Sequence, residues 1–156
     1  MKATPFLRLA SILALLACLG HTFLFVTYIP SHGPEETAVV TAMKIHRFNF
    51  GGFTHSYWEL YFGYGLFVSV GCFVECALFW QLADLARSDI PSVKWILMPL
   101  ILGEVGYSFL MLKYFFLIPI VVHISTAISL ILAFVAALSS SPMTKAFTQA
   151  ARPRRE

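Results

Sequence analysis

The chain of 156 residues is strongly apolar, with 58% hydrophobic residues and only 12% charged residues. Soluble globular proteins carry about 45–50% apolar and about 25% charged residues, so this composition excludes an ordinary soluble domain. A net charge of +3 is too small to indicate nucleic-acid binding. The long apolar segments instead predict a membrane protein that forms one domain over residues 1–156.

The first apolar segment, about residues 6–29, is predicted to be a membrane-spanning helix that Pro30 ends. Its start also resembles a secretory signal, with a loose lipoprotein-like cleavage box at Cys18. The apolar run continues well beyond the usual hydrophobic region of a signal peptide, and this favours a retained helix.

Residues 30–56 are predicted to form an external loop that caps one end of the helices. Pro34, followed by two acidic residues, is typical of a helix start. A short surface helix that Gly51 and Gly52 end and a plain ordered loop remain equal alternatives. The apolar face of such a helix would hold Val39, Val40, Met43 and His46.

Three more spans are predicted at about residues 57–82, 95–113 and 117–138, followed by a cytoplasmic tail at 139–156. The last two spans are joined by a short turn and therefore form an antiparallel hairpin. Lipid tolerates only helices or closed barrels, and the residue alternation of a barrel strand is absent. The expected fold class is all-α, a polytopic membrane protein with a four-transmembrane-helix bundle.

Basic residues predict that both termini face the cytoplasm of a bacterial inner membrane. The inner side would carry eight of them: Lys2, Arg8, Arg87, Lys94, Lys145, Arg152, Arg154 and Arg155. The outer side would carry three: Lys44, Arg47 and Lys113. Aromatic residues agree, with Trp80 and Trp95 at the inner boundary and Tyr28, Trp58 and Tyr114 at the outer one.

Each span carries a lone ionisable residue in its interior, which is costly in lipid and calls for a reason. A rise of about 1.5 Å per residue places Glu104 near the midplane, and His21 and His123 at matched depth in the outer half. A ligand-binding pocket is therefore expected there, lined by His21, Tyr61, Tyr64, Glu104, Tyr107, Ser108 and His123. Glu75 is expected to stand apart as an isolated buried acid on the cytoplasmic side.

These residues leave five interpretations open. They can fix the packing of an accessory protein that has no chemistry of its own, or they can bind a lipophilic ligand or quinone. A membrane-embedded enzyme is less favoured because no recognised catalytic motif accompanies them. His21 and His123 could ligate haem axially, although no cofactor is predicted. A proton or solute relay would use Glu75, and Glu104 with the two histidines above it, and would need an oligomer.

Partners are expected within the membrane. Small residues on several helix faces suit close packing and make a homodimer or a larger membrane complex plausible. Cys72 and Cys76 share a helix face, where packing is favoured over metal binding, so no metal site is predicted. The basic tail can contact anionic membrane lipids or simply fix the topology.

Several segments resemble an uncharacterised family of small four-helix bacterial membrane proteins. They are AMKIHRFNFGG at residues 42–52, SYWELYFGYGLFVSV at 56–70, GHT at 20–22 and KYFFLIP at 113–119. The resemblance covers most of the chain and implies the same topology. The family usually has Asp where Glu59 stands, and it has no established activity to transfer.

The resemblance also directs attention to the junction between the loop and the second span, at Arg47, Tyr57, Trp58 and Glu59. An Arg47–Glu59 ion pair could hold the loop over the helices as a lid. An aromatic belt with an interfacial salt bridge is the favoured alternative.

Overall fold

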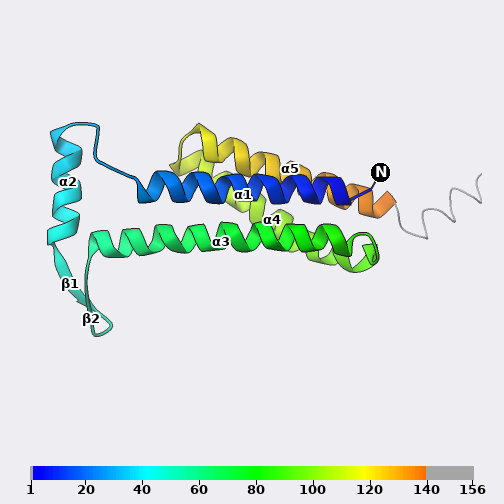
Figure 1. The fold of residues 1–156 in the computed structure, drawn as a ribbon, viewed down its shortest axis with the longest axis horizontal. Coiled ribbons are helices and arrows are strands. Elements are labelled where there is room, and N and C mark those ends of the chain that lie inside the picture. Colours follow the sequence, from blue (N-terminus) through cyan, green and yellow to red (C-terminus); the bar gives the residue numbers. More distant parts are fainter. Residues whose placement is uncertain (1, 140–156) are drawn as a thin grey trace, which may run out of the picture. The chain divides into compact units, whose positions relative to one another are not determined.

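The computed structural model describes residues 2–139 and contains four long helices, one short helix and one β-hairpin (Figure 1). The long helices are α1 (Thr4–Val26), α3 (Tyr57–Leu85), α4 (Ile90–Tyr114) and α5 (Leu117–Ser139). They contain 23, 29, 25 and 23 residues and are apolar enough to cross a membrane. At about 1.5 Å per residue each exceeds the roughly 30 Å hydrocarbon core. The predicted all-α class and the four apolar helices are confirmed.

The described residues divide into two compact units. Unit 1 contains the first part of α1 up to Ala17, the part of α3 from Val74 onward, and all of α4 and α5. Unit 2 is the continuous segment Cys18–Phe73. The predicted basic tail lies outside the described residues, apart from Ser139.

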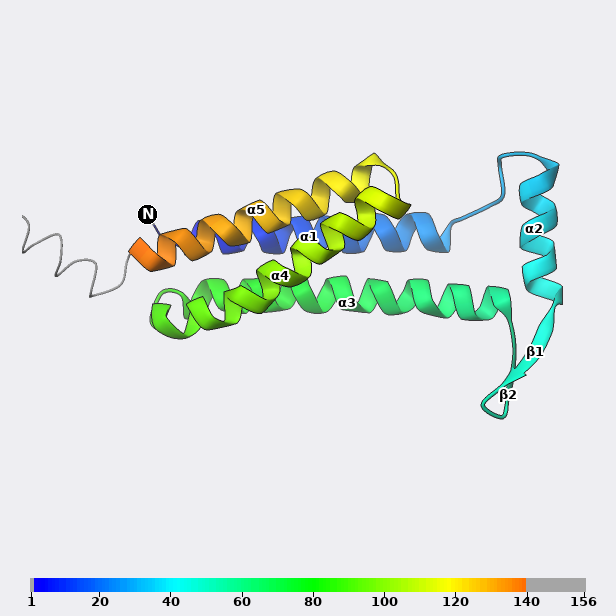
Figure 2. The same cartoon turned by 180° about the vertical axis from the view of Figure 1, so that it is seen from behind.

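Unit 1 is built around the α4–α5 hairpin, whose helices lie side by side (Figure 2). Asp89 caps the start of α4 by accepting a hydrogen bond of 3.2 Å from the amide of Ser92. Small residues on α5 allow close packing, since Ala133, Ala136 and Ala137 are almost fully buried. The other fully buried side chains of this unit include Leu7, Phe79, Val93, Leu97 and Leu130.

Unit 2 contains a helix where a loop was the alternative prediction. Helix α2 (Pro34–Ile45) begins at the predicted proline, and only Val40 of its apolar residues is buried. The prediction that Gly51 and Gly52 end this helix is wrong, because α2 ends at Ile45. The two glycines form the turn of an antiparallel hairpin between β1 (Arg47–Phe50) and β2 (Phe53–Ser56). Their φ angles of 59° and 89° favour glycine there.

Strand β2 leads directly into α3, and a reciprocal pair of hydrogen bonds fixes this junction. The amide of Glu59 donates to Oγ of Ser56 at 3.1 Å, and the amide of Ser56 donates to Oε2 of Glu59 at 2.7 Å. This is the capping box that the sequence Ser-x-x-Glu permits, and it satisfies amides that a helix start leaves unpaired.

Candidate functional site

Unit 1 holds a polar pair in the interior of two apolar helices. Oε2 of Glu104 on α4 and Nδ1 of His123 on α5 are joined by a hydrogen bond of 3.0 Å. The Glu104 residue is only 2% exposed, and the side chain of His123 is 13% exposed. Either atom can hold the proton of this bond, so the pair can both donate and accept hydrogen bonds.

The position of this pair is well inside the α4–α5 hairpin. His123 lies six residues into α5, about 9 Å from its start, and Glu104 lies ten residues before the end of α4, about 15 Å away. The ring of Tyr107 lies 5.5 Å from that of His123, centroid to centroid. Ser108 is also buried, but its hydroxyl donates to the backbone carbonyl of Glu104 at 2.8 Å. The hydroxyl of Ser108 is thus engaged within its own helix.

Glu75 belongs to the same unit as this pair. The charges of Glu104 and His123 both act on its carboxyl group. Its predicted role as an isolated buried acid stays a prediction.

His21, the remaining predicted histidine, belongs to unit 2 and bonds to backbone. Its Nε2 donates a hydrogen bond of 3.0 Å to the carbonyl oxygen of Gly65 on α3. Its ring stacks on Phe25, with centroids 5.4 Å apart. The Phe25 ring fits against Gly65 so closely that a Cβ at this glycine would overlap it. His21 is thus part of the contact between α1 and α3 in this unit.

The other predicted pocket residues of unit 2 are largely exposed. Tyr64 is 70% exposed and contacts Phe67, and Tyr61 is 50% exposed and contacts Phe25 and Trp58. Hence Glu104, Tyr107, Ser108 and His123 come together in unit 1, and His21 and Tyr61 meet the same Phe25 ring in unit 2. A single pocket made from both groups stays a prediction.

The predicted contact between Arg47 and Glu59 is present in unit 2. Nη1 of Arg47 lies 3.3 Å from Oε1 of Glu59, and its Nη2 donates to the carbonyl oxygen of Thr54 at 3.1 Å. Nδ1 of His55 lies 3.7 Å from Oε2 of Glu59. Tyr57 packs on Phe48 at 4.6 Å between centroids. These contacts fasten the hairpin to the start of α3, whereas the predicted role as a lid remains a prediction.

A second carboxylate organises the connection between α1 and α2. Glu36 accepts hydrogen bonds from the hydroxyl of Tyr28 at 2.6 Å and from the amides of Ser31 and His32, both at 2.7 Å. The bond from Tyr28, with those from the backbone, lowers the pKa of Glu36 from 4.5 to about 2. The same bond to Glu36 raises the pKa of Tyr28.

Arg8, in unit 1, makes two contacts that were not predicted from the sequence. Its Nη2 donates to Oδ1 of Asp84 at 2.6 Å, and its Cζ lies 3.4 Å from the ring centroid of Trp80. The proximity of Arg8 to a span end was visible in the sequence, but both partners lie on α3, and Asp84 is 76 positions away. Only the helix register brings them together.

The His, Cys, Asp and Glu side chains of the described residues are not grouped as metal ligands. Within residues 2–139, no group of three or more His, Cys, Asp or Glu side chains is placed to hold a metal ion. His21 and His123 each use one ring nitrogen in a hydrogen bond, and haem ligation by them stays a prediction. Cys76 lies 3.5 Å from the hydroxyl of Ser11, which donates to the Cys76 carbonyl at 2.8 Å. This is a packing contact between α1 and α3 in unit 1.

Comparison of the chain with family models, with curated proteins and with solved structures gave no match.

Proposed function

We propose that the protein is a small integral membrane protein of the bacterial cytoplasmic membrane that binds a lipophilic ligand at the Glu104–His123 pair. The observation that carries this proposal is the buried hydrogen bond of 3.0 Å inside two apolar helices. Polar groups in such surroundings are costly and are commonly functional. The pair suits a ligand with an apolar body and one hydroxyl or carbonyl group, because it can donate to or accept from either.

The proposed topology supports an outer-half location for this site. The distribution of Lys and Arg favours a topology with the α4–α5 turn outside and both termini inside. A ligand would then reach Glu104 and His123 from the outer leaflet, and the aromatic ring of Tyr107 would flank it. A homodimer is a further part of this proposal, suggested by the small residues on several helix faces and tested by the mass of the detergent-solubilised protein.

The test is the lipid content of purified protein. Wild type and Glu104→Gln would be solubilised in the same mild detergent, and bound molecules would be extracted and measured by mass spectrometry. We expect one lipophilic species to be retained by wild type and depleted in Glu104→Gln. Glu35→Gln is the matched control, because Glu35 is exposed in the first turn of α2. Equal retention by all three proteins would contradict the proposal and leave the pair as a packing contact of an accessory protein.

Proton movement is the second candidate function, favoured by the electrostatic interaction of Glu75 with Glu104 and His123. Three protonatable side chains in one unit can form part of a relay. Proteoliposomes with an imposed pH gradient test this. We expect wild type to dissipate the gradient faster than empty vesicles, and Glu75→Gln to slow this dissipation. Rates equal to those of empty vesicles would exclude this candidate.

A further inference from the structure

The β1–β2 hairpin has one aromatic face and one polar face. Opposite residues in an antiparallel pair project to the same side, and neighbours along a strand project to opposite sides. The pairs Phe48–His55 and Phe50–Phe53 therefore form one face. The pairs Arg47–Ser56 and Asn49–Thr54 form the other.

The aromatic face is uncovered at its tip. Phe50 and Phe53 are 72% and 69% exposed, although they are directly paired beside the turn. Toward the base, Phe48 packs on Tyr57 and His55 stacks on Phe53, with centroids 6.3 Å apart. Two adjacent exposed phenylalanines at the end of a hairpin indicate a surface that contacts a membrane or another protein.

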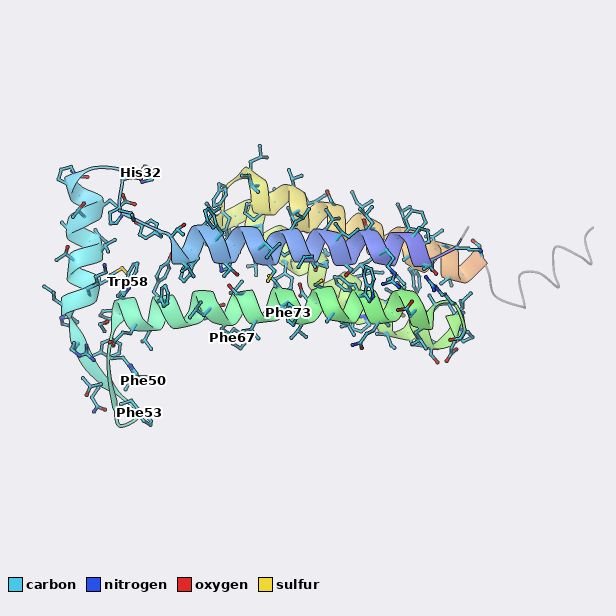
Figure 3. All side chains as sticks on the ribbon, in the orientation of Figure 1. His32, Phe50, Phe53, Trp58, Phe67 and Phe73 are labelled. Carbon is cyan, nitrogen blue, oxygen red and sulfur yellow. The ribbon has the colours of Figure 1, made fainter. Side chains whose placement is uncertain are left out.

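The attachment of the hairpin places it at the membrane boundary. Ser56 ends β2 and Tyr57 begins α3, with no residue between them. Each strand has four residues, so the tip lies within about 14 Å of that junction. The hairpin extends to the side of α3 and does not continue its axis (Figure 1). Figure 3 shows Phe50 and Phe53 on the side of the hairpin toward which α3 extends.

We propose that this hairpin is an interfacial anchor that inserts Phe50 and Phe53 into the lipid of the leaflet in which α3 begins. An element that runs sideways from the end of a spanning helix lies along the bilayer surface, and its face toward the helix meets lipid. The opposite face, with Arg47, Asn49 and Thr54, stays hydrated. Aromatic residues suit this boundary, and the capped junction at Glu59 holds the hairpin at a fixed level. The inference does not depend on the Glu104–His123 site.

Spin labels on the two faces test the anchor in the full-length chain. Four single-cysteine variants, Phe50→Cys, Phe53→Cys, Asn49→Cys and Thr54→Cys, would be made with the native Cys18, Cys72 and Cys76 replaced by alanine. The labelled proteins would be reconstituted in bilayers of phosphatidylcholine and phosphatidylglycerol. Collision rates with oxygen, which concentrates in lipid, and with a water-soluble nickel complex give the depth of each label. The ratio of oxygen to nickel collisions is expected to be several-fold higher at positions 50 and 53 than at 49 and 54.

Two results would overturn the proposal. Equal ratios on both faces would show that the aromatic face is no more exposed to lipid than the polar face. Shielding of positions 50 and 53 from both reagents, with dipolar broadening between labels, would show that a second copy covers the face. Phe50→Trp and Asn49→Trp provide a measurement that keeps the native cysteines. Brominated lipid should quench the added fluorescence in Phe50→Trp and spare it in Asn49→Trp, and equal quenching would likewise overturn the proposal.

Discussion

The hydrogen bond between Glu104 and His123 should make a measurable contribution to the stability of unit 1. The perturbation is a double-mutant cycle of Glu104→Ala, His123→Ala and the double variant, which isolates the interaction of the pair from the other effects of each substitution. The bond connects α4 to α5, so its loss should weaken the packing of that hairpin.

The expected size follows from the geometry of the pair. Interhelical hydrogen bonds in membranes contribute about 0.6 kcal/mol on average and about 1.7 kcal/mol at most. At 3.0 Å, with Glu104 only 2% exposed, the bond is well formed and shielded, which places it in the upper part of this range. We therefore expect a coupling free energy of about 1–1.7 kcal/mol. A fully charged buried pair would show a larger effect, since losing one partner then costs about 3–5 kcal/mol.

The assay is reversible unfolding in mixed micelles of mild detergent and dodecyl sulfate, followed by circular dichroism. The control cycle combines Glu104→Ala with Ser129→Ala, because the Ser129 hydroxyl donates to the carbonyl of Ser125 in its own helix. The control coupling should be near zero. A coupling near zero for Glu104 and His123 as well would refute the reasoning that this bond stabilises the hairpin.

Three further predictions concern other parts of the chain. Gly65→Ala should lower the free energy of unfolding by about 1–3 kcal/mol, because the new methyl group displaces the ring of Phe25. Phe79→Ala should cost about 3–5 kcal/mol through the cavity left by a side chain that is only 1% exposed. The pKa of Glu36 is lowered, so its contribution to stability is complete above pH 4.5 and is lost as the pH falls through about 2.

Detergent unfolding tests the first two predictions, each against a control variant. Gly63→Ala should leave the free energy of unfolding unchanged, since that glycine has open space beside it. A decrease equal to that of Gly65→Ala would contradict the steric argument. Phe73→Ala, at a position 60% exposed, should leave packing unchanged, whereas a loss equal to that of Phe79→Ala would contradict the cavity argument. The amide proton shifts of Ser31 and His32 should titrate with a midpoint near 2, and a midpoint near 4.5 would show that Glu36 is not so bonded.

The four spans could be predicted because a helix that crosses a membrane needs a long apolar stretch, which is visible in the sequence. The ends of the helices were harder to predict: α4 begins at Ile90, five residues before the predicted start. Local chemistry sets that boundary, with Asp89 as cap and Pro91 in the first turn. The hairpin escaped prediction because Gly51 and Gly52 were interpreted as a helix end. The alternation of Arg47, Phe48, Asn49 and Phe50 before them is a strand signal.

The candidate site was predictable in its residue types and only partly in its contacts. Glu104 and His123 stood out because ionisable residues are rare in lipid, and the short turn between their helices brought them close. The partner of His21 is a backbone carbonyl, which has no mark in the sequence. Whether Glu75 stands apart from this pair depends on how the helices pack, and depth counted along each span does not give that packing.

The bonds to backbone carbonyls of α3 have a consequence for how the chain can evolve. Ser11 in unit 1, and Cys18 and His21 in unit 2, each direct a side chain at the carbonyl of a residue on α3. Any amino acid supplies such a carbonyl, so the hydrogen bond by itself constrains only the side chain of the α1 residue. Cys76 and Ser69 should therefore be freer to change than Ser11 and Cys18, whereas Gly65 is also constrained by the ring of Phe25 beside it. Glu104 and His123 are different, because each depends on the side chain of the other, and they should change together or not at all.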